Sequence, residues 1–145
     1  MMELHAGQVP VACEGRTHMT VPLVGSHVAA GFPSPADDYL DRPLDFNELL
    51  ITNPAATFAV RVAGDSMIGI GIFAGDIAIV DRSVTAHDTS IILGIVGGEF
   101  TIKRYRSRGG RVWLEAENVA YKHLVITEES AFEVWGVVRH TIRML

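Results

Sequence analysis

The chain has 145 residues, of which 48% are apolar and 20% are charged, and it carries a formal net charge of −5. This length and composition are typical of one globular domain that buries a real core. The negative charge argues against a general nucleic-acid-binding protein, which usually presents a basic face. The single cysteine, Cys13, excludes an internal disulfide and indicates a reducing compartment, and we interpret it as an incidental thiol.

Residues 1–30 carry few charges and show no regular period, so we expect an arm rather than a folded unit. Val28-Ala29-Ala30 fits the small-residue pattern of a secretory cleavage site, but Glu3 and Glu14 stand where a signal peptide carries positive charge. No segment approaches the roughly 18 apolar residues of a membrane helix. The protein is therefore predicted to be cytoplasmic, with no membrane segment.

Residues 31–44 are rich in proline and aspartate and are predicted to form an extended connector, followed by a short helical turn at Asp45–Leu50. From residue 57 onward, short β-rich runs alternate with glycines, and no helical pattern exceeds about two turns. Gly97-Gly98 predicts a two-residue hairpin. The expected fold class is mostly β, with strands at Thr57–Val62, Ile77–Val80, Ser90–Val96, Glu99–Tyr105, Arg111–Glu115 and Phe132–Val138.

Gly64-Asp65-Ser66-Met67 places a serine in a tight turn just after the first of these strands. Such a serine is most often only a polar turn residue. Here the following Met67-Ile68 indicates that the turn re-enters the core, which would leave the Ser66 hydroxyl at a sheet edge. A glycine turn also lets the backbone approach a substrate closely.

Lys103 lies 37 residues after Ser66, on a predicted strand whose alternation puts Thr101, Lys103 and Tyr105 on one face. Most lysines on a sheet are simply solvated. A lysine that acts as a general base must be neutral, so its pKa must fall from ~10.4 to roughly 7. That shift corresponds to about 4 kcal/mol, which burial of the amine can supply. Ser66 and Lys103 are thus the two groups that a Ser/Lys hydrolase needs.

Two other groups of polar residues bear on the function of the chain. The six histidines are scattered with none at metal-ligand spacing, so neither a metal nor a cofactor is predicted. A basic cluster is either a solvated hairpin tip or a docking surface for DNA or an acidic partner, and the sequence leaves this open. Its members are Lys103, Arg104, Arg106, Arg108 and Arg111.

Several segments together resemble the LexA/UmuD family of self-cleaving Ser/Lys peptidases, and most strongly its UmuD-like members. The resemblance runs from about residue 30 to residue 140. The segments that carry it are Gly31-Phe32-Pro33-Ser34-Pro35-Ala36, Gly64-Asp65-Ser66-Met67, Gly75-Asp76, Ile79-Val80-Asp81, Glu99-Phe100-Thr101-Ile102-Lys103-Arg104 and Val134-Trp135-Gly136-Val137-Val138.

This resemblance implies a LexA/UmuD-type all-β peptidase domain over residues 31–145, with an extended N-terminal arm, residues 1–30, that self-cleavage removes. Ser66 would be the nucleophile, Lys103 the general base, and the bond between Ala30 and Gly31 the one cut. The turn and the resemblance together suggest the backbone N–H groups of Asp65 and Ser66 as oxyanion donors.

The implied role is that of a homodimeric SOS mutagenesis subunit. By the resemblance, a RecA filament on single-stranded DNA stimulates the cut, and the processed dimer joins a UmuC-like Y-family DNA polymerase in error-prone lesion bypass. Three positions depart from the family pattern. Gly69 stands where relatives often have an acidic residue, Thr89-Ser90 replaces a common Gly-Asp, and Ala30 stands where some relatives have cysteine.

The competing interpretation is a non-catalytic dimeric β-domain that binds a polymerase, which needs neither Ser66 nor Lys103. A phage-type repressor is disfavoured because an arm of 30 residues cannot hold a winged helix-turn-helix domain. A signal peptidase shares the Ser/Lys chemistry but is disfavoured because the sequence contains no membrane anchor.

Overall fold

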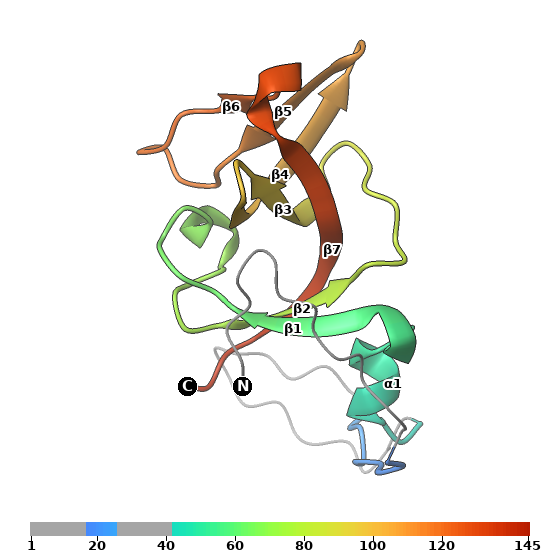
Figure 1. The fold of residues 1–145 in the computed structure, drawn as a ribbon. Coiled ribbons are helices and arrows are strands. Elements are labelled where there is room, and N and C mark those ends of the chain that lie inside the picture. Colours follow the sequence, from blue (N-terminus) through green and yellow to red (C-terminus); the bar gives the residue numbers. More distant parts are fainter. Residues whose placement is uncertain (1–16, 26–41) are drawn as a thin grey trace. The chain divides into compact units, whose positions relative to one another are not determined.

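The computed structural model describes residues 17–25 and 42–145 (Figure 1). These residues belong to two compact units, one within Gly15–Thr52 and one that contains Asn53–Leu145. The predicted boundary between an arm and a core, at residues 30 and 31, lies outside the described residues, as does most of the predicted connector. No helix in the described ranges is long and apolar enough to span a membrane.

The smaller unit contains the short helix α1, Phe46–Leu50, where a helical turn was predicted. Asp45 caps this helix because its carboxylate accepts the Asn47 backbone N–H at 2.9 Å. Val21 and Leu44 form an isolated antiparallel bridge through two backbone hydrogen bonds of 2.7 and 2.8 Å. Residues before and after the undescribed segment 26–41 are thus joined within this unit.

The larger unit is built on one seven-stranded sheet in which every paired strand is antiparallel, and this confirms the predicted β class. The order of the strands in the sheet is β1-β2-β7-β3-β4-β5-β6. The described residues also form three short 3₁₀ helices: one before β1 (Pro54–Ala56), one between β1 and β2 (Ile68–Ile70) and one between β6 and β7 (Glu128–Ser130). The strands are β1 (Thr57–Arg61), β2 (Ile77–Asp81), β3 (Ile91–Val96), β4 (Glu99–Arg108), β5 (Arg111–Glu115), β6 (Leu124–Val125) and β7 (Phe132–Ile142).

All six predicted strands are present, and the turn at Gly97-Gly98 joins β3 to β4 as predicted. Both glycines have positive φ, +57° and +85°, which the tightest hairpin turns require. The strands β4 and β7 are longer than predicted and reach Arg108 and Ile142. The two-residue strand β6 was not predicted.

The larger core cluster packs around Trp135 on β7, an interior strand that lies between β2 and β3 in the sheet (Figure 1). The rings of Phe58 and Phe100 meet Trp135 edge-on, with centroids 5.2 and 5.7 Å away. Val62 and Met67 belong to the same cluster. Because these two residues flank Ser66 in the sequence, the core fixes both ends of the serine turn.

Candidate active site

Ser66 lies in a turn that leaves β1 and returns at once to the core. Gly64 takes a positive φ of +75°, which a residue with a side chain rarely adopts. After the turn, Met67 is only 2% exposed, whereas Ile68 is 38% exposed. The predicted return to the core is therefore made by Met67, and Ile68 lies at the surface in the following 3₁₀ helix.

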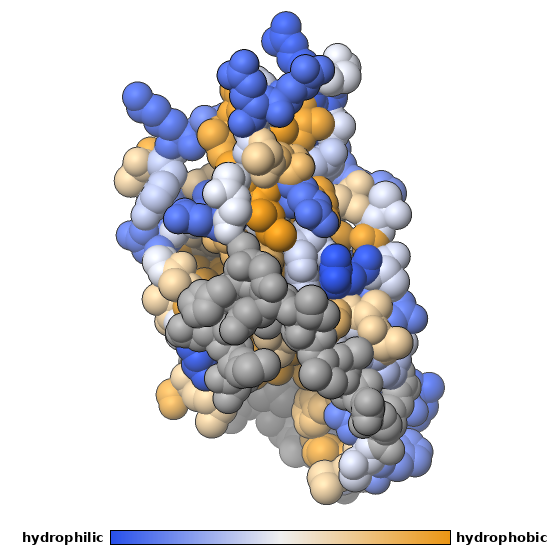
Figure 2. Space-filling model, in the orientation of Figure 1, coloured by the Kyte–Doolittle hydropathy of each residue, from blue (hydrophilic) through white to orange (hydrophobic). Residues whose placement is uncertain are grey.

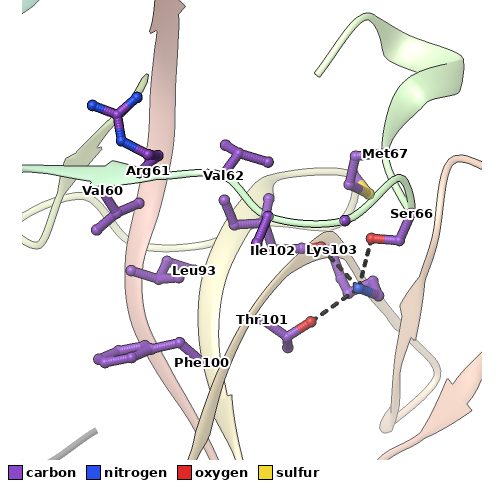
Figure 3. Close-up of a pocket in the computed structure, with 12 residues that line it drawn as sticks. Val60, Arg61, Val62, Ser66, Met67, Leu93, Phe100, Thr101, Ile102 and Lys103 are labelled. Carbon is purple, nitrogen blue, oxygen red and sulfur yellow. Dashed lines mark hydrogen bonds between the residues drawn. The ribbon is translucent and has the colours of Figure 1, made fainter. Parts of the chain in front are cut away.

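Lys103 reaches the serine turn from β4, and its amine lies 2.9 Å from the Ser66 hydroxyl oxygen (Figure 3). The same Nζ is 2.9 Å from Thr101 Oγ1 and 3.1 Å from the carbonyl oxygen of Ile102. The contact with Thr101 agrees with the predicted alternation, which put both side chains on one face of the strand. Two residues that are 37 positions apart in the sequence thus meet at hydrogen-bond distance.

The Ser66–Lys103 pair opens on a pocket of about 280 Å³. Its walls are mainly the apolar side chains of Val60, Val62, Met67, Leu93, Phe100 and Ile102. Arg61 is also among the lining residues, but its guanidinium points away from the other side chains of the pocket (Figure 3). This guanidinium donates to the Gly75 carbonyl at 3.1 Å. Among the residues that the structure describes, no carboxylate lines this pocket.

Burial lowers the pKa of Lys103 below its ordinary value of 10.5, because desolvation penalises the ammonium form. An ammonium can donate to all three neighbouring oxygens. A neutral amine keeps two N–H donors and has one lone pair. The Ile102 carbonyl can only accept a hydrogen bond, so the lone pair of the neutral amine must face the hydroxyl group of Ser66 or of Thr101. When it faces Ser66, Lys103 can accept the proton of the Ser66 hydroxyl.

Asp65 is held by two contacts from one distant loop. Its carbonyl oxygen accepts the Asn118 side-chain amide at 3.0 Å, and its carboxylate accepts the Tyr121 hydroxyl at 2.5 Å. No predicted role involved Asn118 or Tyr121, because they lie in a loop without a regular pattern, more than fifty residues from Asp65 in the sequence. Ala30 and Gly31 lie outside the described residues.

Most members of the basic cluster are paired with carboxylates. Arg104 donates to Glu117, Arg106 to Asp88 and Glu115, and Arg108 to Asp88. The Ser107 backbone N–H and the Arg106 guanidinium lower the pKa of Asp88 to about 2. Figure 2 shows hydrophilic side chains at the end of the sheet where the β4–β5 hairpin lies. The positive charge available to a partner at this hairpin is therefore smaller than the count of arginines suggests.

One group in the described part of the chain brings together three side chains of metal-ligand type. Ligand atoms of His18, Asp45 and Glu48 lie within 4.8 Å of one another, a proximity that their sequence spacing does not reveal. Both Asp45 oxygens already accept hydrogen bonds, from His18 at 2.8 Å and from the Asn47 backbone at 2.9 Å. The cap of helix α1 and its contact with His18 explain why these side chains lie close together, so we assign no metal to the group.

Comparisons with known proteins place the chain in a family. The Peptidase S24-like family model matches residues 22–139. Protein SamA of Salmonella typhimurium is 41% identical over 119 residues, which cover 82% of each chain. Protein MucA of Escherichia coli is 35% identical over 127 residues, or 88% of this chain and 86% of the relative. The LexA repressor of Shewanella sediminis is 35% identical over 121 residues, or 82% of this chain and 58% of the repressor.

The antiparallel β fold, its Ser66–Lys103 pair and the match over residues 22–139 define a protein of the S24 serine-peptidase class. Within that class, the chain belongs to the LexA/UmuD family, in its UmuD-like branch. The resemblance inferred from the sequence is thereby confirmed.

Proposed function

We propose that this chain is a UmuD-like SOS-response protein that cuts its own backbone between Ala30 and Gly31 with a Ser66–Lys103 dyad. The observation that carries the proposal is the 2.9 Å contact between Lys103 Nζ and Ser66 Oγ beside an apolar pocket. A purely non-catalytic β-domain would have no use for a half-buried amine in contact with a serine hydroxyl, so this contact favours the peptidase over the binding module.

In the first step, the neutral Lys103 amine accepts the proton of the Ser66 hydroxyl while Oγ attacks the carbonyl carbon of Ala30. The N–H groups of Asp65 and Ser66 donate to the oxyanion that forms. Lys103, now an ammonium, returns the proton to the Gly31 nitrogen as the Ala30–Gly31 bond breaks. The products are a new amino terminus at Gly31 and an ester between Ala30 and Ser66.

In the second step, Lys103 accepts a proton from a water molecule, whose oxygen attacks the ester carbonyl. The ester bond breaks, the proton returns to Ser66 Oγ, and Ala30 leaves as a carboxylic acid, which releases its remaining proton to the solvent and becomes a carboxylate. Lysine can serve both steps because burial keeps its pKa below the ordinary value. No metal or cofactor is required by this sequence of steps.

The pocket suits the proposed substrate. Its apolar walls, which include Val60 and Leu93, match the small apolar residues Val28-Ala29-Ala30 that precede the bond. Gly31 has no side chain to collide with the serine turn. The pocket volume of about 280 Å³ exceeds what one methyl group fills, so it can accept more than one side chain of this segment.

The processed chain, residues 31–145, is proposed to act as a homodimer in the cytoplasm and to join a UmuC-like Y-family DNA polymerase in error-prone lesion bypass. A RecA filament on single-stranded DNA is proposed to stimulate the cut. These roles are supported by the membership of the chain in the UmuD-like branch. That membership rests on alignments with three differently named relatives, each of which extends over more than four fifths of the chain.

The proposal is tested by incubating the full chain with RecA, single-stranded DNA and a nucleotide, then measuring intact mass. We expect a fragment running from Gly31 to Leu145, whose N-terminal sequence begins Gly-Phe-Pro-Ser-Pro. Ser66→Ala should abolish the cut without changing the melting temperature, since the serine turn is anchored by its neighbours in the core.

The matched control is Ser107→Ala, which removes a serine hydroxyl that does not line the pocket and should leave the rate unchanged. A product with a different first residue would overturn the assignment of the cleaved bond. Normal processing by Ser66→Ala would remove Ser66 from the mechanism and favour the binding module.

A further inference from the structure

The loop of residues 116–123, between β5 and β6, contacts both the serine turn and the part of the sheet that carries the lysine. Two hydrogen bonds hold Asp65, the residue before Ser66. Asn118 Nδ2 donates to the Asp65 carbonyl oxygen at 3.0 Å, and Tyr121 Oη donates to Asp65 Oδ1 at 2.5 Å. The loop therefore grips both the backbone and the side chain of the residue adjacent to the serine.

The same loop is tied to the other side of the serine turn and to β4. The Gly69 N–H donates to the Glu117 carbonyl oxygen at 2.7 Å. A Cβ atom on Gly69 would lie only 2.5 Å from that oxygen, so the approach depends on glycine. The Glu117 carboxylate in turn accepts the Arg104 guanidinium, and Arg104 directly follows Lys103.

The loop holds its own shape through hydrogen bonds around Asn118. The Tyr121 N–H donates to the Asn118 carbonyl, and the Ala120 N–H donates to the Asn118 side-chain oxygen, both at 3.0 Å. The serine turn, in contrast, begins at Gly64, where a Cβ atom would meet nothing within 4 Å. The core holds the two ends of this turn at Val62 and Met67, and between those ends the loop adds the two side-chain hydrogen bonds to Asp65.

We propose that Asn118 and Tyr121 are positioning residues that keep Ser66 Oγ within hydrogen-bond distance of Lys103 Nζ. This inference rests on the proposed function, because it concerns the reactivity of Ser66. Neither residue lines the pocket, and neither hydrogen-bonds to Ser66 Oγ or Lys103 Nζ. They act through Asp65. Because Asp65 directly precedes Ser66 in the chain, holding Asp65 in place also holds Ser66 in place.

The test measures how fast a fluorophosphonate probe modifies Ser66 in the full chain at pH 9, with the modified residue identified by peptide mass spectrometry. The hydrogen bond to Asp65 raises the pKa of Tyr121 above its ordinary value of 10.0, so the phenol is still a donor at this pH. We expect Tyr121→Phe to slow the modification about tenfold, as expected for losing one hydrogen bond to a carboxylate. Asn118→Ala should also slow it.

The matched control is Tyr105→Phe, which removes the same hydroxyl from a ring that stacks on Phe132 with centroids 6.4 Å apart. It should react at the wild-type rate. Melting temperatures of all variants show whether the fold is intact. A slower reaction caused only by unfolding would appear as a lower melting temperature and would overturn the positioning role.

A second comparison separates positioning from general packing. In an Asp65→Ala background the acceptor is absent, so Tyr121→Phe should have no further effect on the rate. Additive effects of the two changes would overturn the inference. If the probe modifies Ser66 equally fast in the wild-type protein and in Tyr121→Phe, the positioning role is refuted, whereas Ser66 remains the proposed nucleophile. If wild-type protein does not label at Ser66, the proposed nucleophile fails and the inference with it.

Discussion

Raising the pH should accelerate self-cleavage without any activator, because Lys103 must be deprotonated to accept the Ser66 proton. The amine is half-buried, and none of the described residues that line its pocket carries a carboxylate. Burial lowers the pKa of Lys103 from the ordinary value of 10.5. As the pH rises through this lowered pKa, the neutral fraction of Lys103 grows. The rate should therefore rise with pH and then level off above that pKa.

The size of this effect follows from the titration of one group. Below the pKa of the base, the neutral fraction grows about tenfold for each pH unit, so the rate can rise by up to about 100-fold between pH 7 and pH 9. The increase is smaller if Lys103 titrates within this interval. The assay is the rate of appearance of the Gly31–Leu145 fragment by intact mass spectrometry, at several pH values and without RecA.

Lys103→Arg should be inactive at every pH, because a guanidinium stays protonated throughout this range. Lys122→Arg is the matched control, since Lys122 lies in an exposed loop, and it should keep the wild-type profile. Lys103→Met gives a second inactive variant if the larger guanidinium disturbs the fold, as judged by the melting temperature. Equal rates from pH 7 to pH 10 in the wild type, or cutting by Lys103→Arg, would refute the assignment of Lys103 as the base.

Three further predictions concern stability, each measured by urea or acid unfolding. Thr89 has a φ of +81°, so Thr89→Gly should raise the free energy of unfolding by about 1 kcal/mol, and a loss would show that the strain is absent. A Cβ on Gly136 would lie 2.6 Å from Val80 Cγ1, so Gly136→Ala should cost about 1–3 kcal/mol. The hydrogen bond from Arg143 lowers the pKa of Asp76 to about 2, so the stability that this carboxylate contributes should be lost as pH falls from about 4 through 2. The stability of Asp76→Asn should not change with pH in this way.

The sequence predicts strand positions well because each strand carries its own pattern of β-branched and aromatic residues. It misses the C-terminal end of β4, where Arg106, Ser107 and Arg108 place polar side chains on both faces of the strand. These residues are strand because they pair with Trp113, Val112 and Arg111 on β5. The same holds for β6, whose two residues are strand only through pairing with β5.

The candidate site also contains some residues that the sequence indicates and others that only the folded structure reveals. Ser66 and Lys103 could be found from the sequence because short motifs surround them, but the 2.9 Å between them depends on a strand order that no motif contains. Asn118 and Tyr121 could not be found, because an amide and a phenol in a loop are common and their role arises only from contact with Asp65. Gly69 likewise marks a close approach that only the folded chain reveals.

The strand order has a consequence for the timing of synthesis. The strands next to the serine turn, β1 and β2, make no backbone pairing with the β3–β4 hairpin that carries Lys103, and β7 alone joins the two halves of the sheet (Figure 1). β7 spans Phe132–Ile142, so it is the last strand to leave the ribosome. A nascent chain therefore contains both Ser66 and Lys103 before it contains the strand that joins the two halves of the sheet. If the chain cuts itself as proposed, this order delays the complete sheet around the Ser66–Lys103 pair, and with it the cut, until β7 has been synthesised.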